Sequence, residues 1–153
     1  MENNLKREII LDNYNNPFNK NKKPDDTYKK INTSSTSCID DLDIYFKIEK
    51  NIIKDVIFKG EACAISTSAT SIFSKKIIGK NIKDLKELIT NYKNMIEEKP
   101  YNKELLGELL VYDEIYQKPN RKGCALIPVK AIERLIEEYD NKRTKWRKNK
   151  NNF

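Results

Sequence analysis

The sequence predicts an α+β fold with an N-terminal helix, a three-stranded antiparallel sheet and several C-terminal helices packed on one face of the sheet. Two observations carry this prediction. Apolar and polar side chains alternate along residues 42–49, which is the period of a strand. From residue 82 onward the apolar side chains recur every three or four positions, which is the period of a helix. Strands followed by a run of helices are typical of the α+β class.

The first predicted element is an amphipathic helix from Leu5 to Asn13. Its apolar face is expected to carry Leu5, Ile9 and Ile10. Its solvent-facing side is expected to carry Lys6, Arg7 and Asp12. Pro17 ends the helix. The segment from Phe18 to Ser37 has no period, and its Pro24 and Ser/Thr cluster predict a long loop or extended arm.

A β-hairpin follows this arm. Residues 42–48 form its first strand, and Lys50 and Asn51 form a short turn. The second strand carries Ile53, Val56 and Phe58. The third strand is expected at Ala62 to Ser66, directly after the hairpin.

The remaining chain is predicted to be helical. A helix rich in small residues is expected from Ser66 to Ile78, with Gly79 as its stop and Asn81 as the cap of the next helix. That next helix presents one apolar face from Ile82 to Ile96.

Two more helices complete the prediction. Pro100 separates the preceding helix from one at 105–112. A loop is expected from Pro119 to Gly123, and a last helix from Cys124 to Ile136, with Pro128 in its first turn.

Length and composition favour one folded unit. At 153 residues and 18.0 kDa the chain is interpreted as a single domain, 1–153, with residues 1–4 and 141–153 flexible. Its hydrophobic content of 38% argues against disorder of the whole chain. The longest apolar runs are far shorter than the roughly 20 residues of a membrane span. The net charge of +7 is interpreted as a solvated, lysine-rich surface, and a nucleic-acid binder is the alternative.

The three cysteines are the candidate chemical groups. The absence of a leader sequence and the odd number of cysteines favour a reducing cytoplasm rather than a disulfide framework. Cys38, Cys63 and Cys124 each fall at the boundary of a predicted element, where a scaffold exposes reactive groups. Asp40 follows Cys38 by two residues, so an extended backbone would place both on one side. Spacing alone leaves two readings open: a metal site, or three small buried side chains.

Four stretches of sequence resemble the motifs of one family. REIILDNYNNPFN is similar to the N-terminal signature of U-type iron–sulfur cluster assembly proteins, the NifU N-terminal/IscU superfamily. STSCID, FKGEACAISTSATS and PNRKGCALIPVKAIE resemble the first-, second- and third-cysteine motifs of that family, in the family's order. Gly123 stands where the IscU branch has histidine, and the segment between Cys63 and Cys124 carries extra helical sequence. Both features favour the SufU branch.

The resemblance implies a fold, a site and partners. It implies a zinc ion bound by Cys38, Asp40, Cys63 and Cys124. It also implies a cytoplasmic carrier, rather than a turnover enzyme, that accepts persulfide sulfur from a pyridoxal-phosphate-dependent cysteine desulfurase of the SufS type. Cys38 is the expected acceptor because a long polar arm precedes it, and Arg121 is the expected supporting cation. Downstream partners would be apo iron–sulfur proteins or other assembly factors.

Some positions depart from the family pattern, and some readings stay open. Ile39 replaces a glycine, Asn13 a histidine, Phe18 a basic residue and Gly123 a lysine. These replacements concern partner contacts and fine geometry rather than the identity of the ligands. The main alternative function is a scaffold on which iron or a [2Fe–2S] cluster is assembled. A remote alternative is nucleic-acid binding through the basic tail that contains Trp146. The serines Ser66, Ser68 and Ser71 are expected to pack at a helix start.

Overall fold

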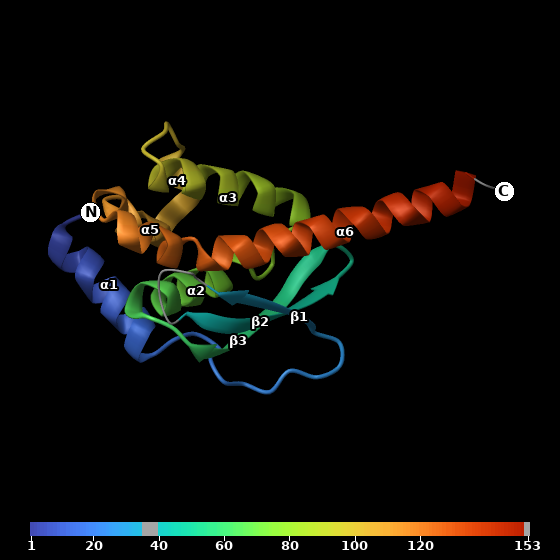
Figure 1. The fold of residues 1–153 in the computed structure, drawn as a ribbon, viewed down its shortest axis with the longest axis horizontal. Coiled ribbons are helices and arrows are strands. Elements are labelled where there is room, and N and C mark those ends of the chain that lie inside the picture. The colour runs from blue at the N-terminus through green and yellow to red at the C-terminus, as the bar shows by residue number, and fades with distance from the viewer. Residues whose placement is uncertain (35–39, 152–153) are drawn as a thin grey trace.

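An antiparallel sheet of three strands supports the fold (Figure 1). The computed structural model describes residues 1–34 and 40–151. The strands are β1 (Lys29–Ser34), β2 (Asp41–Glu49) and β3 (Ile52–Glu61), and they lie in the order β1-β2-β3. The predicted α+β class with a three-stranded antiparallel sheet is therefore confirmed.

The position of the third strand differs from the prediction. Ala62–Ser66 was expected to be a strand, but Ala64 begins a helix, and the third strand is β1, inside the segment expected to be a loop. β1 is an edge strand in which Ile31 and Thr33 are the buried residues. A strand with two inward side chains gives too short an alternation to be distinguished by period from a loop.

The β2–β3 hairpin is confirmed. Lys50 and Asn51 form its turn with φ values of 51° and 67°. Positive φ at both central positions is the geometry of the tight hairpin turn that matches the twist of the two strands, and asparagine tolerates it well. The turn lies at the end of the sheet opposite the start of β2, so Asp41 pairs with Glu61 at the far end.

Six α-helices and two 3₁₀ segments make up the rest of the described chain. The long ones are α1 (Asn3–Asn15), α2 (Ala64–Ile77), α3 (Ile82–Ile96) and α6 (Ile127–Asn151). The short ones are α4 (Lys103–Leu106), η1 (Gly107–Tyr112), η2 (Ile115–Gln117) and α5 (Pro119–Ala125).

The helix caps follow the sequence signals, with one exception. Gly79 has a φ of 90°, and the Asn81 side chain accepts a hydrogen bond from the Lys83 N–H, as predicted. The loop predicted at Pro119–Gly123 is wrong, because these residues begin α5. Proline is favoured at the first position of a helix, so Pro119 starts a helix here rather than excluding one. Cys124 consequently lies near the end of α5 instead of opening the last helix.

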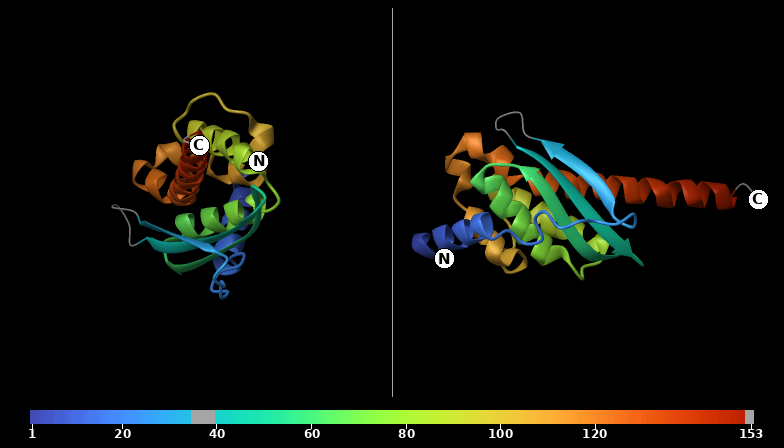
Figure 2. Two further views of the ribbon diagram at one scale, coloured as in Figure 1. Left: turned by 90° about the vertical axis from the view of Figure 1, so that its right-hand side faces the viewer. Right: turned by 90° about the horizontal axis from the view of Figure 1, so that it is seen from below.

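The helices cover one face of the sheet in layers (Figures 1 and 2). The sheet contributes Ile44, Phe46, Val56 and Phe58 to a single hydrophobic core. α2 packs against β3 and α6 packs against β1, and α3 lies beyond them, with Phe73 of α2 in edge-to-face contact with Tyr92 of α3. Helices packed on one face leave the opposite face to the extended arm of residues 17–28.

The arm is held to β3 by backbone and side-chain hydrogen bonds. The Asn21 N–H donates to the Phe58 carbonyl at 2.9 Å. The Tyr28 hydroxyl donates to Asp55 Oδ2 at 2.5 Å, and the Asn19 side-chain amide donates to Asp55 Oδ1 at 3.0 Å. The segment predicted to be a loop is thus an ordered strap that ends in β1.

Helix α1 turns a different face inward from the one predicted. Leu5 was expected inside and Lys6 outside, but Leu5 is 47% exposed and Lys6 is 9% exposed. The Lys6 ammonium reaches Asp113 at 2.6 Å, and this ion pair compensates its burial. Asn13 is also buried, and its side-chain carbonyl accepts a hydrogen bond from Ser71 of α2 at 2.8 Å.

Helix α6 continues past the body of the molecule to Asn151 (Figure 2). The apolar spacing that predicted this helix ends near Ile136. The flexibility expected of residues 1–4 and 141–153 stays a prediction. Within the described part of the chain, no helix combines the length and the apolar character needed to cross a membrane.

Candidate functional site

The candidate site lies at the end of the sheet where β2 begins and β3 ends. The β2–β3 register places Asp41 opposite Glu61, so the residues just outside this pair approach each other. The Cys63 N–H donates a hydrogen bond of 2.8 Å to Asp40 Oδ1. Two residues 23 positions apart in the sequence are therefore joined by the sheet register.

Gly60 allows the two strands to approach closely beside the site. It has a φ of 124°, and a Cβ added to it would lie 2.2 Å from the Asp41 carbonyl oxygen. That distance is far inside van der Waals contact, and this φ strongly disfavours any residue with a side chain. Gly60 thus fixes the end of β3, which leads into Cys63, against the segment that carries Asp40.

Cys63 is the N-cap residue of α2. Its Sγ accepts a hydrogen bond from the Ser66 N–H at 3.5 Å. The N–H groups at a helix start interact favourably with negative charge, and those of α2 face the sulfur of Cys63. The small-residue helix predicted after this cysteine therefore supplies part of the site.

Cys124 comes to the site from α5 and completes a group of three. Its side chain is fully buried, Asp40 is 2% exposed, and Cys63 is partly exposed. One ligand atom from each of Asp40, Cys63 and Cys124 lies within 4.8 Å of the other two. The fold thus brings together three of the four residues that the sequence singled out.

The Asp40 carboxylate lies among hydrogen-bond donors. Burial raises the pKa of this carboxyl, but hydrogen bonds from the Ser66 hydroxyl, the Cys63 N–H and the two thiols lower the pKa by more. The net result is a pKa below the usual value. Asp40 is therefore an ionised carboxylate at neutral pH, as a metal ligand must be.

Ser66 belongs to the site, although the sequence suggested only packing for it. Its Oγ lies 2.6 Å from Asp40 Oδ2, 3.1 Å from the Cys124 carbonyl oxygen and 3.5 Å from Cys63 Sγ. The available signal was its spacing: a residue three positions after a helix N-cap faces that cap. The contacts of Ser66 with Asp40 and Cys124 arise only in the tertiary structure, so the local sequence does not predict them.

Two other predicted residues have different outcomes. Cys38 falls outside the described ranges 1–34 and 40–151, so its predicted roles as ligand and sulfur acceptor stay predictions. Arg121 lies on α5, one turn before Cys124, and its side chain is exposed. Its predicted supporting role also stays a prediction.

The donor set fits a thiophilic metal ion. Two ligands that each lie about 2.0–2.3 Å from one zinc ion are at most about 4.6 Å apart. Atoms within 4.8 Å of one another need only small side-chain movements to reach that arrangement. Thiolate and carboxylate ligands suit zinc and iron, whereas magnesium and calcium prefer oxygen ligands alone.

Comparison with protein families gives an independent result. The sequence model of the family described as the NifU-like N terminal domain matches residues 5–146. This range contains most of α1, the whole sheet, and the residues Asp40, Cys63 and Cys124.

Characterised relatives and a solved structure agree with the family match. The zinc-dependent sulfurtransferase SufU of Bacillus subtilis (strain 168) is 29% identical over 133 residues, which cover 86% of this chain and 89% of that protein. The iron–sulfur cluster assembly scaffold protein IscU of Thermotoga maritima is 27% identical over 131 residues, covering 86% and 92% of the two chains. FiSufU of Fervidobacterium islandicum AW-1, a crystal structure assigned to cluster assembly for the SUF system, superposes with a TM-score of 0.76 at 30% identity. It covers 82% of this chain and 92% of that one.

Proposed function

This chain belongs to the family of NifU-like N-terminal domains, and we propose that it serves iron–sulfur cluster assembly as a zinc-dependent acceptor of sulfur. The observation that carries the proposal is the convergence of Asp40, Cys63 and Cys124 from three separate segments. The name of the B. subtilis relative, a zinc-dependent sulfurtransferase, supports the same reading. We further propose that the chain acts as one domain in the cytoplasm.

Four residues would hold the zinc ion in this proposal. Asp40, Cys63 and Cys124 supply one oxygen and two sulfur ligands, and Cys38 supplies the third sulfur. The ion would keep the thiolates deprotonated and protect them from oxidation. The chain's own contribution is to hold the ligands together. Gly60 fixes the approach of two strands, and the N-terminus of α2 faces Cys63.

Cys38 is the proposed acceptor of the sulfur atom. The donor would be a persulfide on a pyridoxal-phosphate-dependent cysteine desulfurase of the SufS type. The Cys38 thiolate attacks the outer sulfur of that persulfide, the S–S bond of the donor breaks, and the donor cysteine leaves as a thiolate. One sulfur atom moves with no net change in redox state. The exposed Arg121 on α5 would support the anionic persulfide.

The test combines metal analysis with sulfur mapping. Protein purified without added metal should contain about one zinc per chain, with sulfur-rich coordination in X-ray absorption spectra. After incubation with the desulfurase and cysteine, alkylation and mass spectrometry should locate a persulfide on Cys38. Cys38→Ser should abolish stimulation of the desulfurase. A label on Cys63 or Cys124 with Cys38 unmodified would contradict the acceptor assignment.

A cluster scaffold is the second candidate, because the T. maritima relative is named a scaffold protein. Two thiolates and a carboxylate also suit iron. In this case, anaerobic reconstitution with iron and sulfide would give a brown protein that passes its cluster to apo iron–sulfur proteins. A colourless protein that keeps its zinc under the same treatment favours the sulfur acceptor.

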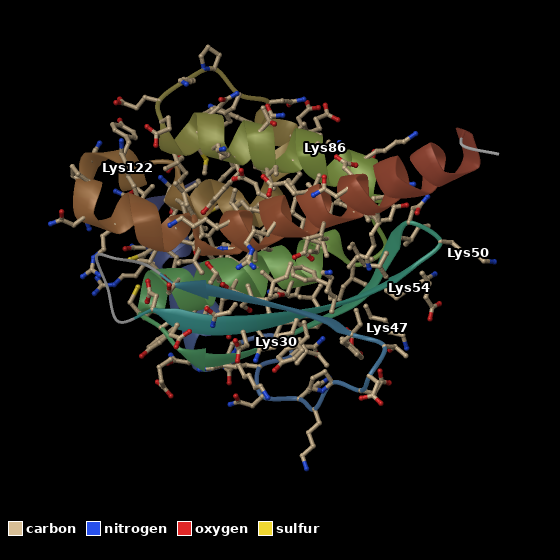
Figure 3. All side chains as sticks on the ribbon, turned by 45° about the vertical axis from the view of Figure 1, so that its right-hand side comes forward. Lys30, Lys47, Lys50, Lys54, Lys86 and Lys122 are labelled. Carbon is tan, nitrogen blue, oxygen red and sulfur yellow. The ribbon has the colours of Figure 1, made fainter. Side chains whose placement is uncertain are left out.

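The distribution of lysines bears on the remote nucleic-acid alternative. Figure 3 shows lysines spread over the sheet, the hairpin turn and the helices: Lys30, Lys47, Lys50, Lys54, Lys86 and Lys122. Several are paired with carboxylates: Lys30 with Asp43, Lys86 with Asp140 and Lys122 with Glu97. This distribution is typical of a solvated surface. The alternative stays a prediction, which salt-dependent retention on DNA with and without residues 142–153 would test.

A further inference from the structure

The hydroxyl of Ser66 lies at the centre of the candidate site. It is fully buried and comes from the first turn of α2. Its oxygen lies within hydrogen-bonding reach of Asp40 Oδ2, the Cys124 carbonyl and Cys63 Sγ. All three candidate ligand residues therefore contact a single side chain that is itself a poor zinc ligand.

The direction of the Ser66 hydrogen bond follows from the acceptors. A hydroxyl carries one proton, and its competing acceptors are Asp40 Oδ2 at 2.6 Å and the Cys124 carbonyl at 3.1 Å. The carboxylate is the nearer acceptor and is charged, and hydrogen bonds to charged acceptors are shorter and stronger. The proton therefore goes to Asp40. The Cys63 N–H occupies the other carboxylate oxygen, so both oxygens of Asp40 are held.

We infer that Ser66 is a positioning residue that orients Asp40 toward the metal. This inference rests on the proposed zinc centre. It gives a role in that centre to a residue that is not itself a ligand. With Oδ1 bound to a backbone N–H and Oδ2 to Ser66, the carboxylate keeps one orientation before the metal arrives. A ligand fixed in advance loses less conformational entropy on binding, and loss of such an outer partner commonly weakens metal binding about 10- to 100-fold.

The other buried hydroxyls of α2 show what a packing role looks like. Thr70 and Ser74 donate to carbonyls one turn earlier in their own helix, at 2.8 and 2.7 Å. Ser68 pairs with the Tyr112 hydroxyl at 2.5 Å. The Ser66 hydroxyl, in contrast, contacts Asp40, Cys63 and Cys124, which form the candidate metal-binding group. The same helix thus provides matched controls.

The first experiment measures zinc affinity by competition with a chromophoric chelator. Ser66→Ala should lower the affinity by about 10-fold or more. Ser74→Ala, which removes another buried hydroxyl from the same helix, should leave the affinity within about twofold of wild type. Ser66→Thr keeps the hydroxyl and should restore most of the loss. If the alanine variant does not fold, Ser66→Gly, which also removes the hydroxyl, takes its place with the same expectation.

A double-mutant cycle tests whether Ser66 acts through Asp40. If it does, Asp40→Ala with Ser66→Ala should bind zinc as weakly as Asp40→Ala alone, because the positioned group is already gone. Additive losses in the two variants would overturn the inference. So would an unchanged zinc affinity in Ser66→Ala.

The outcomes also separate this inference from the proposed function. A wild-type protein that binds no zinc would overturn both. A wild-type protein that binds zinc, and whose affinity Ser66→Ala leaves unchanged, would overturn only the role of Ser66. Both measurements use zinc alone as the probe, so neither depends on sulfur transfer.

Discussion

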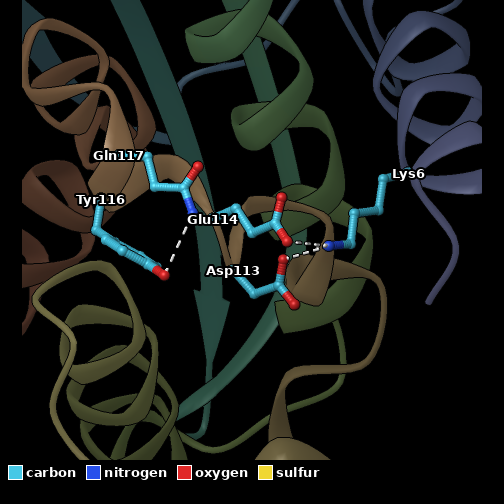
Figure 4. A network of polar contacts seen from close by, with 5 residues as sticks. All are labelled: Lys6, Asp113, Glu114, Tyr116 and Gln117. Atoms are coloured by element: carbon cyan, nitrogen blue, oxygen red, sulfur yellow. Dashed lines mark hydrogen bonds and ion pairs between the residues drawn. The ribbon is translucent and has the colours of Figure 1, made fainter.

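Two polar clusters, one partly exposed and one buried, differ in how the charge of a carboxylate is compensated. In the first, which joins α1 to the segment after η1, the Lys6 ammonium lies 2.6 Å from Asp113 and 3.8 Å from Glu114 (Figure 4). In the second, Asp40 accepts hydrogen bonds from neutral groups, the Cys63 N–H and the Ser66 hydroxyl, and lies beside two thiols. Asp113 therefore faces a cation of the chain. Asp40 instead faces two thiols, which become anionic when they bind a metal ion.

The difference distinguishes a structural cluster from a binding cluster. An ion pair holds two elements together, and each partner compensates the charge of the other. A carboxylate that converges with two thiols gathers negative charge once the thiols ionise, and a bound cation stabilises such a group. The comparison therefore predicts that variants of the second cluster mainly change metal binding, and that variants of the first mainly change the stability of the fold.

The largest effect is expected from Asp40→Ala. Loss of a ligand should lower zinc affinity by about 100-fold or more, since even an outer-shell partner contributes about 10- to 100-fold. The metal-free variant should remain folded, which circular dichroism would check. Chelator competition measures the affinity, with Lys6→Met as the control from the other cluster. Zinc retention equal to wild type would show that Asp40 is not a ligand.

Gly60→Ala should lower both the stability of the fold and the affinity of the site for zinc. The new Cβ would lie 2.2 Å from the Asp41 carbonyl, so the strands beside Asp40 must separate. We expect a loss of about 3 kcal/mol in the free energy of unfolding together with weaker zinc binding. Gly79→Ala is the matched control: its φ is also positive, at 90°, but its Cβ would meet no atom within 4 Å. Its cost should be about 1 kcal/mol, with zinc affinity unchanged. Equal losses for both in urea denaturation would contradict this.

Lys6→Met should destabilise the fold and spare the site. The change leaves Asp113 without its ammonium partner in a half-buried position, which should cost about 1–3 kcal/mol in urea denaturation. Adding Asp113→Leu should recover part of the loss, because the remaining carboxylate is then removed. Zinc affinity that falls as far as in Asp40→Ala would break the distinction between the clusters.

The same ion pair predicts a dependence on alkaline pH. The hydrogen bond with Asp113 raises the pKa of Lys6 above its usual 10.5, with burial opposing. Because the pKa is higher in the folded state, the pair's contribution is complete below pH 10.5 and is lost as the pH rises through the folded pKa. Wild type and Lys6→Met should therefore converge in unfolding free energy at high pH. A constant difference up to full deprotonation would contradict this.

The smallest effect is expected at the strap on the outer face. The hydrogen bond to Asp55, with burial, raises the pKa of Tyr28 from 10.0 to about 12. The stabilisation should be complete below pH 10.0 and lost as the pH approaches about 12. Tyr28→Phe should cost about 1 kcal/mol at neutral pH and remove one late-ionising tyrosine from the titration curve. Absorbance titration of tyrosinate measures this; an unchanged titration curve would contradict it.

Much of the local structure could be predicted from the sequence. The alternation at 42–48 and the turn at Lys50–Asn51 gave the hairpin, and the apolar spacing of 82–96 gave α3. The stops and caps at Gly79 and Asn81 were also correct. These features depend on residues within a few positions of one another, which is the range over which period and capping act.

The errors share a different property. β1 exists because Ile31 packs opposite Ile44 of β2, and Lys6 turns inward because Asp113, 107 positions away, lies beside it. Neither partner is visible in the local sequence. An edge strand and a buried lysine are stabilised by tertiary contacts that outweigh local preference.

For the candidate site, the sequence by itself determined which residue types are available for the chemistry: three cysteines and Asp40, in motifs of a fixed order. Only the tertiary structure decided their grouping. The β2–β3 register joins Asp40 to Cys63, the docking of α5 brings Cys124 within 4.8 Å, and the turn of α2 adds Ser66. The physical reason is that side-chain type is local, whereas distances between residues 40, 63 and 124 are set by strand pairing and helix packing over the whole chain.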